Sequence, residues 1–195
     1  MPPSASHLRL ASESTRRPIV PSSVLGMLLF VAAETMLFAG MISAFTIVRT
    51  SSVIWPPPGQ PRLPVAATAV NTAALLASGL VLYAAQRSFL RNHRSALRPL
   101  GIAVLLGSFF VLFQGAEWAA LVRQGLTLSS STMGSFFYLI VGMHAGHAVA
   151  ALGLLGHTWL RLRQGWLVQS QLAAAQVFWY FVVGLWPILY MVVYL

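Results

Sequence analysis

The sequence predicts an all-α protein, a polytopic transmembrane bundle of about five helices. The chain of 195 residues is 57% hydrophobic and only 8% charged, whereas soluble domains carry about 25% charged residues. Its apolar residues fall into five runs that are long enough to cross a bilayer as helices. It has no lysine, and its 12 arginines lie outside the centres of these runs. The net charge of +9 therefore indicates membrane topology rather than nucleic-acid binding.

The first span is predicted at residues 25–48, with Glu34 near its middle. Residues 1–21 before it are polar and rich in serine, proline and arginine, which predicts a disordered cytoplasmic tail ahead of a single five-helix domain at residues 22–195. A loop follows with Trp-Pro-Pro-Pro-Gly at residues 55–59. Consecutive prolines cannot continue a helix, and a tryptophan suits the membrane interface.

The second and third spans are predicted at residues 64–85 and 99–122. The second begins with a proline, which a helix tolerates in its first turn. Small and hydroxyl residues inside this span favour close packing against another helix. These residues are Asn71, Thr72, Ser78 and Gly79. The third span carries Gln114 and Glu117 near its far end.

The fourth span is predicted at residues 133–160 and is long enough to tilt in the bilayer. It carries His144 and His147, whose spacing places both rings on one face of a helix. Gly142 and Gly146 form a Gly-x-x-x-Gly motif, which predicts tight packing at this point.

The fifth span is predicted at residues 172–195 and contains Pro187, which is expected to kink the helix. Its tryptophans and tyrosines predict a packing and interface belt rather than a cofactor site. These aromatic residues are Trp179, Tyr180, Trp186, Tyr190 and Tyr194.

The arginines predict the orientation of the bundle. Nine of them lie in the tail and in the loops after the second and fourth spans, and three, Arg49, Arg62 and Arg123, lie on the other side. The positive-inside rule then places the N-terminus in the cytoplasm and the C-terminus outside.

Glu34 is the strongest candidate for a functional group. An ionised carboxylate at the bilayer centre costs about 2.5–3.5 kcal/mol on insertion scales. No basic side chain lies within a helical turn of it, so the carboxyl is expected to be protonated or paired with a group on another helix. Two interpretations stay open: a proton carrier or lipid-headgroup acceptor, and a neutral acid that hydrogen-bonds a neighbouring helix.

The other buried polar residues favour helix contacts. Glu117, with Gln114 one turn before it, predicts an interfacial hydrogen bond or a salt bridge to an outer arginine. His144, His147, Gln114 and Asn71 are predicted as polar contacts between helices.

A metal site is not expected. The two histidines supply two potential ligands, whereas metal sites usually use three or four. Glu34 and Glu117 could complete a set only if the helices brought them together. The chain has no cysteine, which excludes disulfides and thiolate metal sites. Nor is any catalytic residue predicted.

Six segments, taken in order, together resemble subunit III of the haem-copper cytochrome oxidases. Each motif is modest alone, but the series extends over residues 24–195. The segments are Ala-Glu-Thr-Met-Leu-Phe-Ala-Gly at 33–40, Trp-Pro-Pro-Pro-Gly at 55–59, Val-Asn-Thr with Leu-Leu-Ala-Ser-Gly at 70–79, Gln-Gly-Ala-Glu-Trp at 114–118, Gly-Ser-Phe-Phe-Tyr at 134–138 and Gly-Met-His-Ala-Gly-His at 142–147. They are similar to the family's Ser-Glu-x-x-x-Phe-x-Gly, Trp-Pro-Pro-x-Gly, Leu-Asn-Thr-x-x-Leu-Leu-x-Ser-Gly, Gln-x-x-Glu-aromatic, Gly-Ser-x-Phe-Phe and Gly-x-His-x-x-His patterns.

The resemblance implies a non-catalytic subunit of a respiratory terminal oxidase, which reduces oxygen to water with electrons from cytochrome c or quinol. Such a subunit carries no haem or copper itself. It packs on the catalytic subunit I that holds them, binds phospholipid between its helix groups, and supports proton uptake and stability. By this resemblance Glu34 is the buried carboxyl of the subunit, and His144 and His147 are its paired histidines. The implied location is multi-pass, in the cell inner membrane.

The sequence departs from the family pattern in two respects. The common form has seven spans, and this chain matches the last five, as short forms of the family do. The last helix of the family typically reads Trp-His-Phe-Val-Asp-x-x-Trp, whereas residues 179–186 here place Tyr180 and Val183 at the histidine and aspartate positions. Two polar contacts are thereby lost, which is compatible with a divergent branch such as the subunit-III-like proteins of nitric oxide reductases.

Two further functions compete with the oxidase subunit. The first is a stand-alone proton-coupled transporter with Glu34 as the carrier, although the chain shows no internal repeat and no pair of broken helices in matching positions. The second is a membrane metalloenzyme built on the two histidines and the glutamates.

Overall fold

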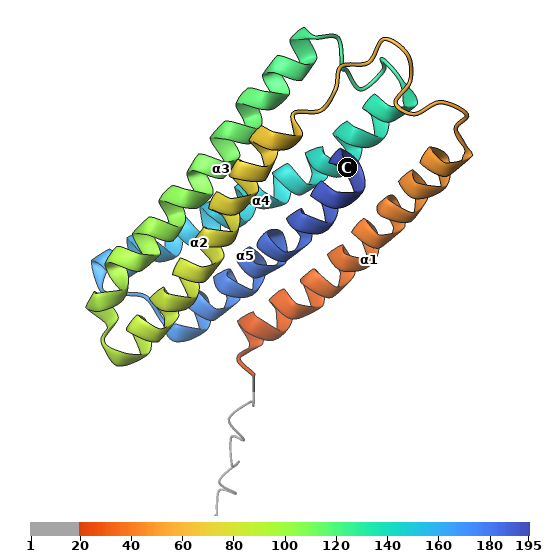
Figure 1. The fold of residues 1–195 in the computed structure, drawn as a ribbon. Coiled ribbons are helices and arrows are strands. Elements are labelled where there is room, and N and C mark those ends of the chain that lie inside the picture. The colour runs from red at the N-terminus through yellow and green to blue at the C-terminus, as the bar shows by residue number, and fades with distance from the viewer. Residues whose placement is uncertain (1–19) are drawn as a thin grey trace, which may run out of the picture.

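The computed structural model describes residues 20–195, and this part of the chain contains five long helices and no strand (Figure 1). Each helix is long and apolar enough to cross a membrane. The helices are α1 (Ser22–Ser51), α2 (Val65–Arg91), α3 (Leu97–Arg123), α4 (Thr132–Gln164) and α5 (Gln169–Leu189). A short 3-10 helix, η1 (His93–Ala96), precedes α3, and a π-helical turn, η2 (Tyr190–Tyr194), follows α5. The five predicted spans are confirmed. Most of the predicted disordered tail at residues 1–21 lies outside the described residues.

The helices run alternately up and down. The loops at residues 52–64 and 124–131 lie at the same end of the bundle as the C-terminus, whereas the two short connections near residues 92 and 165–168 lie at the other end (Figure 1). Arg49, Arg62 and Arg123 therefore belong to one end of the described chain. The placement of the two ends relative to the membrane remains a prediction from the arginine distribution.

Helix α5 occupies the middle of the bundle. It packs against α1, α2 and α4, while α2 packs on α3 and α3 on α4. Helix α1 is peripheral and contacts mainly α5 and α4 (Figure 1). The only residues of α1 that are fully buried are Phe38 and Phe45. Most of the apolar surface of α1 is consequently left for lipid or another protein to cover.

Two indole rings fasten α5 to α2. The Nε1–H of Trp179 donates to Ser78 Oγ at 3.0 Å, and the Nε1–H of Trp186 donates to Thr72 Oγ1 at 2.8 Å. Both tryptophans are completely buried. The expectation of close packing at the hydroxyl residues of the second span is confirmed, and these two rings belong to the core rather than to an interface belt.

Some glycines of the bundle lie against a neighbouring helix, where a side chain would not fit, and others face open space. A Cβ on Gly107 would lie 2.6 Å from the ring of Trp179, and a Cβ on Gly79 would lie 3.1 Å from Val183. The predicted tight packing at the Gly-x-x-x-Gly motif is wrong at Gly146, where a Cβ would meet nothing within 4 Å. The reason is that Gly146 lies on the outward face of α4, which the spacing of two glycines does not identify.

Pro187 lies inside α5, and the helix changes to π-helical hydrogen bonding three residues later. Proline supplies no N–H to the helical ladder, so one carbonyl of the preceding turn loses its usual partner. The altered turn at residues 190–194 carries Tyr194 inward, where its ring is 7% exposed. This position lets the hydroxyl reach the polar residues of α3.

Candidate functional site

Apart from His144, the predicted polar residues form two separate groups, one between α1 and α4 and one between α2, α3 and the π-helical turn. In the first, Glu34 Oε2 lies 3.1 Å from His147 Nε2. The other ring nitrogen, Nδ1 of His147, lies 2.8 Å from the carbonyl oxygen of Met143 in the preceding turn. Glu34 on α1 therefore has a close basic neighbour on another helix, α4.

The hydrogen-bond chemistry of this pair defines its charge. A carbonyl oxygen can only accept, so Nδ1 of His147 carries the hydrogen that Met143 receives. Nε2 and Glu34 Oε2 lie 3.1 Å apart, within the distance of an ion pair but without hydrogen-bond geometry. One further proton, on the imidazole or on the carboxyl, would make the two groups complementary. In both forms the pair has no net charge, which suits a site at the depth of the bilayer.

Aromatic rings pack around the imidazole of His147. Four phenylalanine rings lie with their centroids 5.5–6.3 Å from the imidazole of His147. They are Phe30, Phe38, Phe178 and Phe181. Because these rings offer little solvation, they strengthen the interaction of the carboxyl with the imidazole.

The second group links three elements through amide side chains. Asn71 Nδ2 donates to Gln114 Oε1 at 3.3 Å and to the carbonyl oxygen of Phe110 at 3.2 Å. Gln114 Nε2 in turn donates to the hydroxyl of Tyr194 at 3.1 Å. This chain of bonds connects α2, α3 and η2 and is buried along its length.

Glu117 accepts a hydrogen bond from Thr68 Oγ1 at 3.0 Å, which joins α3 to α2. Within residues 20–195 no arginine pairs with it. Of the two partners predicted for Glu117, the structure therefore has the hydrogen bond and not the salt bridge. Sequence reasoning missed Thr68. The available signal was its position one helical turn before Thr72, a recurrence of hydroxyl residues in an otherwise apolar span.

The two histidines of α4 have different surroundings although they share one helix. His147 faces α1 and Glu34, whereas the ring of His144 stacks on Trp186 with centroids 5.0 Å apart. The side chain of His144 is 1% exposed. Neither of its ring nitrogens has a hydrogen-bond partner in the described part of the chain.

The structure does not bring the candidate metal ligands into one set. Glu34 meets His147, while Glu117 lies with Thr68 at the other group. Among residues 20–195 no three histidine, aspartate or glutamate side chains come together in a way that could hold a metal ion.

Tyr180 and Val183, at the positions where the family pattern has histidine and aspartate, lie on the side of α5 that faces α2. Val183 is nearly buried against Gly79, and Tyr180 is 37% exposed. Together with Tyr83 they line an apolar groove of about 460 Å³. Hydrophobic contact with α2 thus occupies the position at which the family pattern has a carboxylate.

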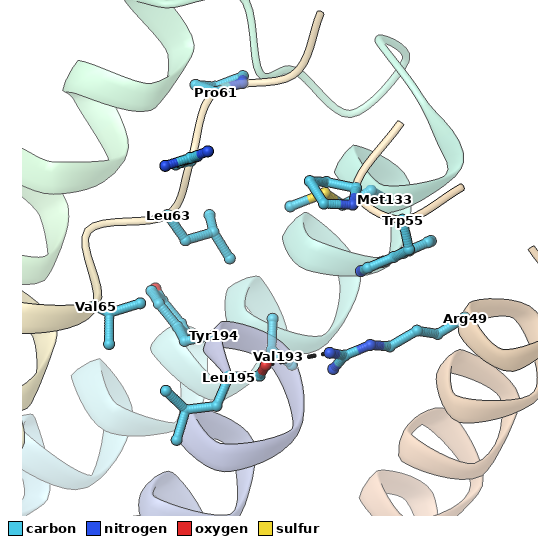
Figure 2. Close-up of a pocket in the computed structure, with 11 residues that line it drawn as sticks. Arg49, Trp55, Pro61, Leu63, Val65, Met133, Val193, Tyr194 and Leu195 are labelled. Carbon is cyan, nitrogen blue, oxygen red and sulfur yellow. Dashed lines mark hydrogen bonds between the residues drawn. The ribbon is translucent and has the colours of Figure 1, made fainter. Parts of the chain in front are cut away.

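A pocket of about 370 Å³ lies at the end of the bundle that carries the C-terminus (Figure 2). Arg49 extends from α1 along its edge, and its guanidinium donates to the main-chain oxygens of Val192 at 2.9 Å and Leu195 at 3.2 Å. Trp55 closes the neighbouring wall and packs edge-on against Phe45, with ring centroids 5.6 Å apart. This arginine therefore ties the end of α1 to the last turn of the bundle.

Comparison with known proteins gives one consistent result. The sequence model of the family described as cytochrome c oxidase subunit III matches residues 15–195. The cytochrome c oxidase subunit 3 of Synechocystis sp. is 32% identical over 175 residues, which cover 87% of this chain and 74% of that protein. The proteins of the same name from Locusta migratoria and Homo sapiens are 33% and 31% identical, and each alignment covers 87% of this chain and 67% of the relative.

Proposed function

Because this chain belongs to the cytochrome c oxidase subunit III family, we propose that it is a non-catalytic subunit of a respiratory haem-copper terminal oxidase. The family match over residues 15–195 carries this proposal. It makes the chain a multi-pass membrane protein of an oxidase complex. We place the complex in the cell inner membrane and take the catalytic subunit I as the principal neighbour.

The redox chemistry belongs to that partner in this proposal. Haem and copper are held by subunit I, and this chain supplies no redox centre. Its donor set supports the division, because the chain has no cysteine and the two glutamates in residues 20–195 lie in different groups, Glu34 with His147 and Glu117 with Thr68. The roles left to this chain are packing on the catalytic subunit, binding of phospholipid and support of proton uptake.

The Glu34–His147 pair is our candidate for the proton-linked role. It joins α1 to α4 near the middle of both helices, and phenylalanine rings pack around the imidazole of His147. The apolar outward surface of α1 is our candidate for phospholipid contact, since this helix buries few of its residues. The groups around Glu117, Gln114, Asn71 and His144 have a structural role in holding α2, α3 and α4 together.

The proposal is tested by purifying the chain in mild detergent from its native membranes through an affinity tag. We expect haem absorbance in the visible spectrum and a large polytopic partner by mass spectrometry, with phospholipid retained in the preparation. The same tag on an unrelated multi-pass protein controls for carry-over. A colourless chain that purifies alone after lipid-preserving extraction would contradict the proposal and favour the stand-alone transporter.

A second candidate, a subunit-III-like protein of a nitric oxide reductase, is favoured by the replacements at Tyr180 and Val183. The purified complex separates the two candidates by its substrate. Consumption of oxygen with reduced cytochrome c or quinol supports the terminal oxidase, and consumption of nitric oxide without oxygen uptake supports the reductase.

A further inference from the structure

We propose that a basic pocket between η1 and the end of α4 binds the phosphate of an anionic phospholipid, whose acyl chain lies along the seam between α3 and α4. The pocket lies at the end of the bundle opposite the C-terminus and has a volume of about 370 Å³. Its lining combines three basic residues, His93, Arg94 and Arg163, with apolar residues that include Leu97 and Leu162. The inference rests on the proposed function in that this chain binds phospholipid, and it assigns a site away from α1.

The first step is the charge of the pocket. His93, Arg94 and Arg163 are all exposed, so a headgroup can reach them. Within residues 20–195 no carboxylate pairs with them, because Glu34 and Glu117 have their contacts elsewhere. Basic pockets between transmembrane helices are typical sites for anionic headgroups. A guanidinium also presents parallel N–H groups that match two oxygens of one phosphate.

The second step is the arrangement of the basic side chains. The imidazole of His93 stacks on the ring of Phe89, with centroids 4.2 Å apart and planes 6° from parallel. The guanidinium carbon of Arg163 lies 5.9 Å from the centroid of the Trp159 ring. Side chains held in this way lose less freedom when they bind a ligand. The positive-inside rule explains why arginines gather at this end, but it does not explain why aromatic rings position them around a pocket.

The third step is the path for an acyl chain. A second, apolar crevice of about 210 Å³ lies between α3 and α4 and is lined by Gly115 and Ala145, among others. Gly115 follows Leu97 by 18 residues on α3, and Ala145 precedes Arg163 by 18 residues on α4. Eighteen residues make five helical turns, so the basic pocket and the crevice lie on the same side of both helices. The seam between α3 and α4 joins them.

The surface and the length of this seam suit a lipid chain. The residues that lie between the two pockets on these faces are partly exposed. They are Gly101, Val104 and Ser108 of α3 and Leu152, Gly156 and Trp159 of α4. The hydroxyl of Ser108 donates to the carbonyl of Val104 at 2.8 Å and leaves the seam without a free donor there. Val111, at the near end of the crevice, lies 14 residues after Leu97, or about 21 Å along the helix. One leaflet with its headgroups is about 20–22 Å thick.

The headgroup is tested with phosphatidylglycerol that carries a photoreactive diazirine on its acyl chain. The probe is added to the tagged complex in phosphatidylcholine nanodiscs, and crosslinked peptides of α3 and α4 are quantified by mass spectrometry. We expect the Arg94→Gln, Arg163→Gln double variant to weaken binding about 30-fold, because each arginine near a membrane surface contributes about fivefold. The Arg91→Gln, Arg98→Gln double variant removes the same charge from exposed residues outside the pocket and is the matched control.

Three results of this experiment would overturn the proposal. Equal crosslinking in the two double variants would show that the charge of the whole end, and not the pocket, attracts the lipid. Equal crosslinking by a phosphatidylcholine probe would show that the headgroup charge is not recognised. Full competition by millimolar inorganic phosphate would show that the pocket binds phosphate without a lipid chain.

The acyl chain is tested by blocking the seam. Gly156 lies two turns before Arg163 on the same face of α4, and a Cβ there would meet nothing within 4 Å. We expect Gly156→Phe to lower crosslinking at least tenfold without loss of the folded complex. Gly153→Phe, at an exposed glycine that also has free space but lies to one side of the seam, is the control. Unchanged crosslinking in Gly156→Phe would contradict a chain in the seam.

The haem spectrum and the partner chains are recorded for every preparation. A parent complex without haem contradicts the proposed function, while the crosslinks in this chain still report on the lipid site. A haem-containing complex in which the probe does not crosslink α3 and α4 contradicts the lipid site alone.

Discussion

At the scale of single residues, the carboxyl of Glu34 depends on one partner. His147 Nδ1 donates to Met143, so Nε2 is the nitrogen that faces Glu34. Within residues 20–195 the pair is the sole contact between a side-chain carboxyl and a basic side chain close enough for an ion pair. A substitution of Glu34 that keeps a polar group beside His147 is therefore expected to affect stability less than one that removes it.

We predict that Glu34→Gln leaves the complex assembled with little change in Tm. The amide of the new glutamine can donate an N–H to Nε2 of His147, which replaces the proton of the native pair. Glu34→Leu leaves Nε2 without a partner and is expected to cost about 1–3 kcal/mol. The measurement is the amount of this chain in the purified complex together with its thermal unfolding. Loss of the complex in Glu34→Gln would instead indicate that an ionised carboxylate is required.

The candidate residues show how far sequence reasoning reaches at this scale. Glu34 and Glu117 could be singled out because carboxyls in apolar runs are rare. Their partners could not, because the contacts of Glu34 with His147 and of Glu117 with Thr68 depend on the rotation and vertical register of neighbouring helices. Neither quantity is encoded within one span. The same limit explains why His144 and His147 have different surroundings despite sharing a helix.

At the scale of helices, the bundle is assembled by close approach at a few small residues. The ring of Trp179 lies over Gly107 of α3 and donates to Ser78 of α2. One buried side chain of α5 thereby determines the position of two neighbouring helices. Hydropathy predicted the five helices from length and apolar composition, but it carried no information about which glycine meets a neighbour, and the expectation for Gly146 failed for this reason.

We predict that Gly107→Ala destabilises the bundle, because its Cβ would lie 2.6 Å from the ring of Trp179. Overpacking of this kind costs about 1–3 kcal/mol. Gly153→Ala is the matched control, since a Cβ there would meet nothing within 4 Å. The check is the Tm of the two variants in the same detergent. Equal values would show that Trp179 yields without strain and that Gly107 does not govern the contact.

The contact of Arg49 with the end of the bundle gives another prediction at this scale. Arg49→Met removes two hydrogen bonds to main-chain oxygens near the C-terminus and is expected to cost about 1–2 kcal/mol. Arg62→Met changes an exposed arginine that lines the same pocket and should have little effect. Protease digestion of the purified complex measures the result as faster cleavage near residues 52–64. Equal cleavage of both variants would contradict a role for Arg49 in holding α1.

At the scale of the whole molecule, the even alternation of the helices reduces the topology to one choice, namely which end of the bundle faces the cytoplasm. The arginine distribution predicts that the end with the connections near residues 92 and 165–168 is cytoplasmic. Because the chain has no cysteine, each loop can be labelled through one introduced thiol.

We predict that Ser129→Cys reacts with a membrane-impermeant maleimide in intact cells and that Gln164→Cys reacts only after the membrane is opened. Both positions are exposed and lie at opposite ends of the bundle. The parent chain, without cysteine, gives the background signal. The reverse pattern of labelling would invert the assignment of both termini.

The attachment of α1 also has a consequence for the biogenesis of the protein. This helix is the first of the five to leave the ribosome, yet it packs on α4 and α5. Arg49 at its end donates to Val192 and Leu195, which lie more than 140 positions later in the sequence. Until α4 and α5 have been inserted, α1 lacks its main packing partners within residues 20–195 and stays in the lipid with its apolar surface uncovered. Translation that stalls after α3 would therefore leave a stable α2–α3 hairpin beside an unattached α1, a form that membrane quality-control proteases could recognise.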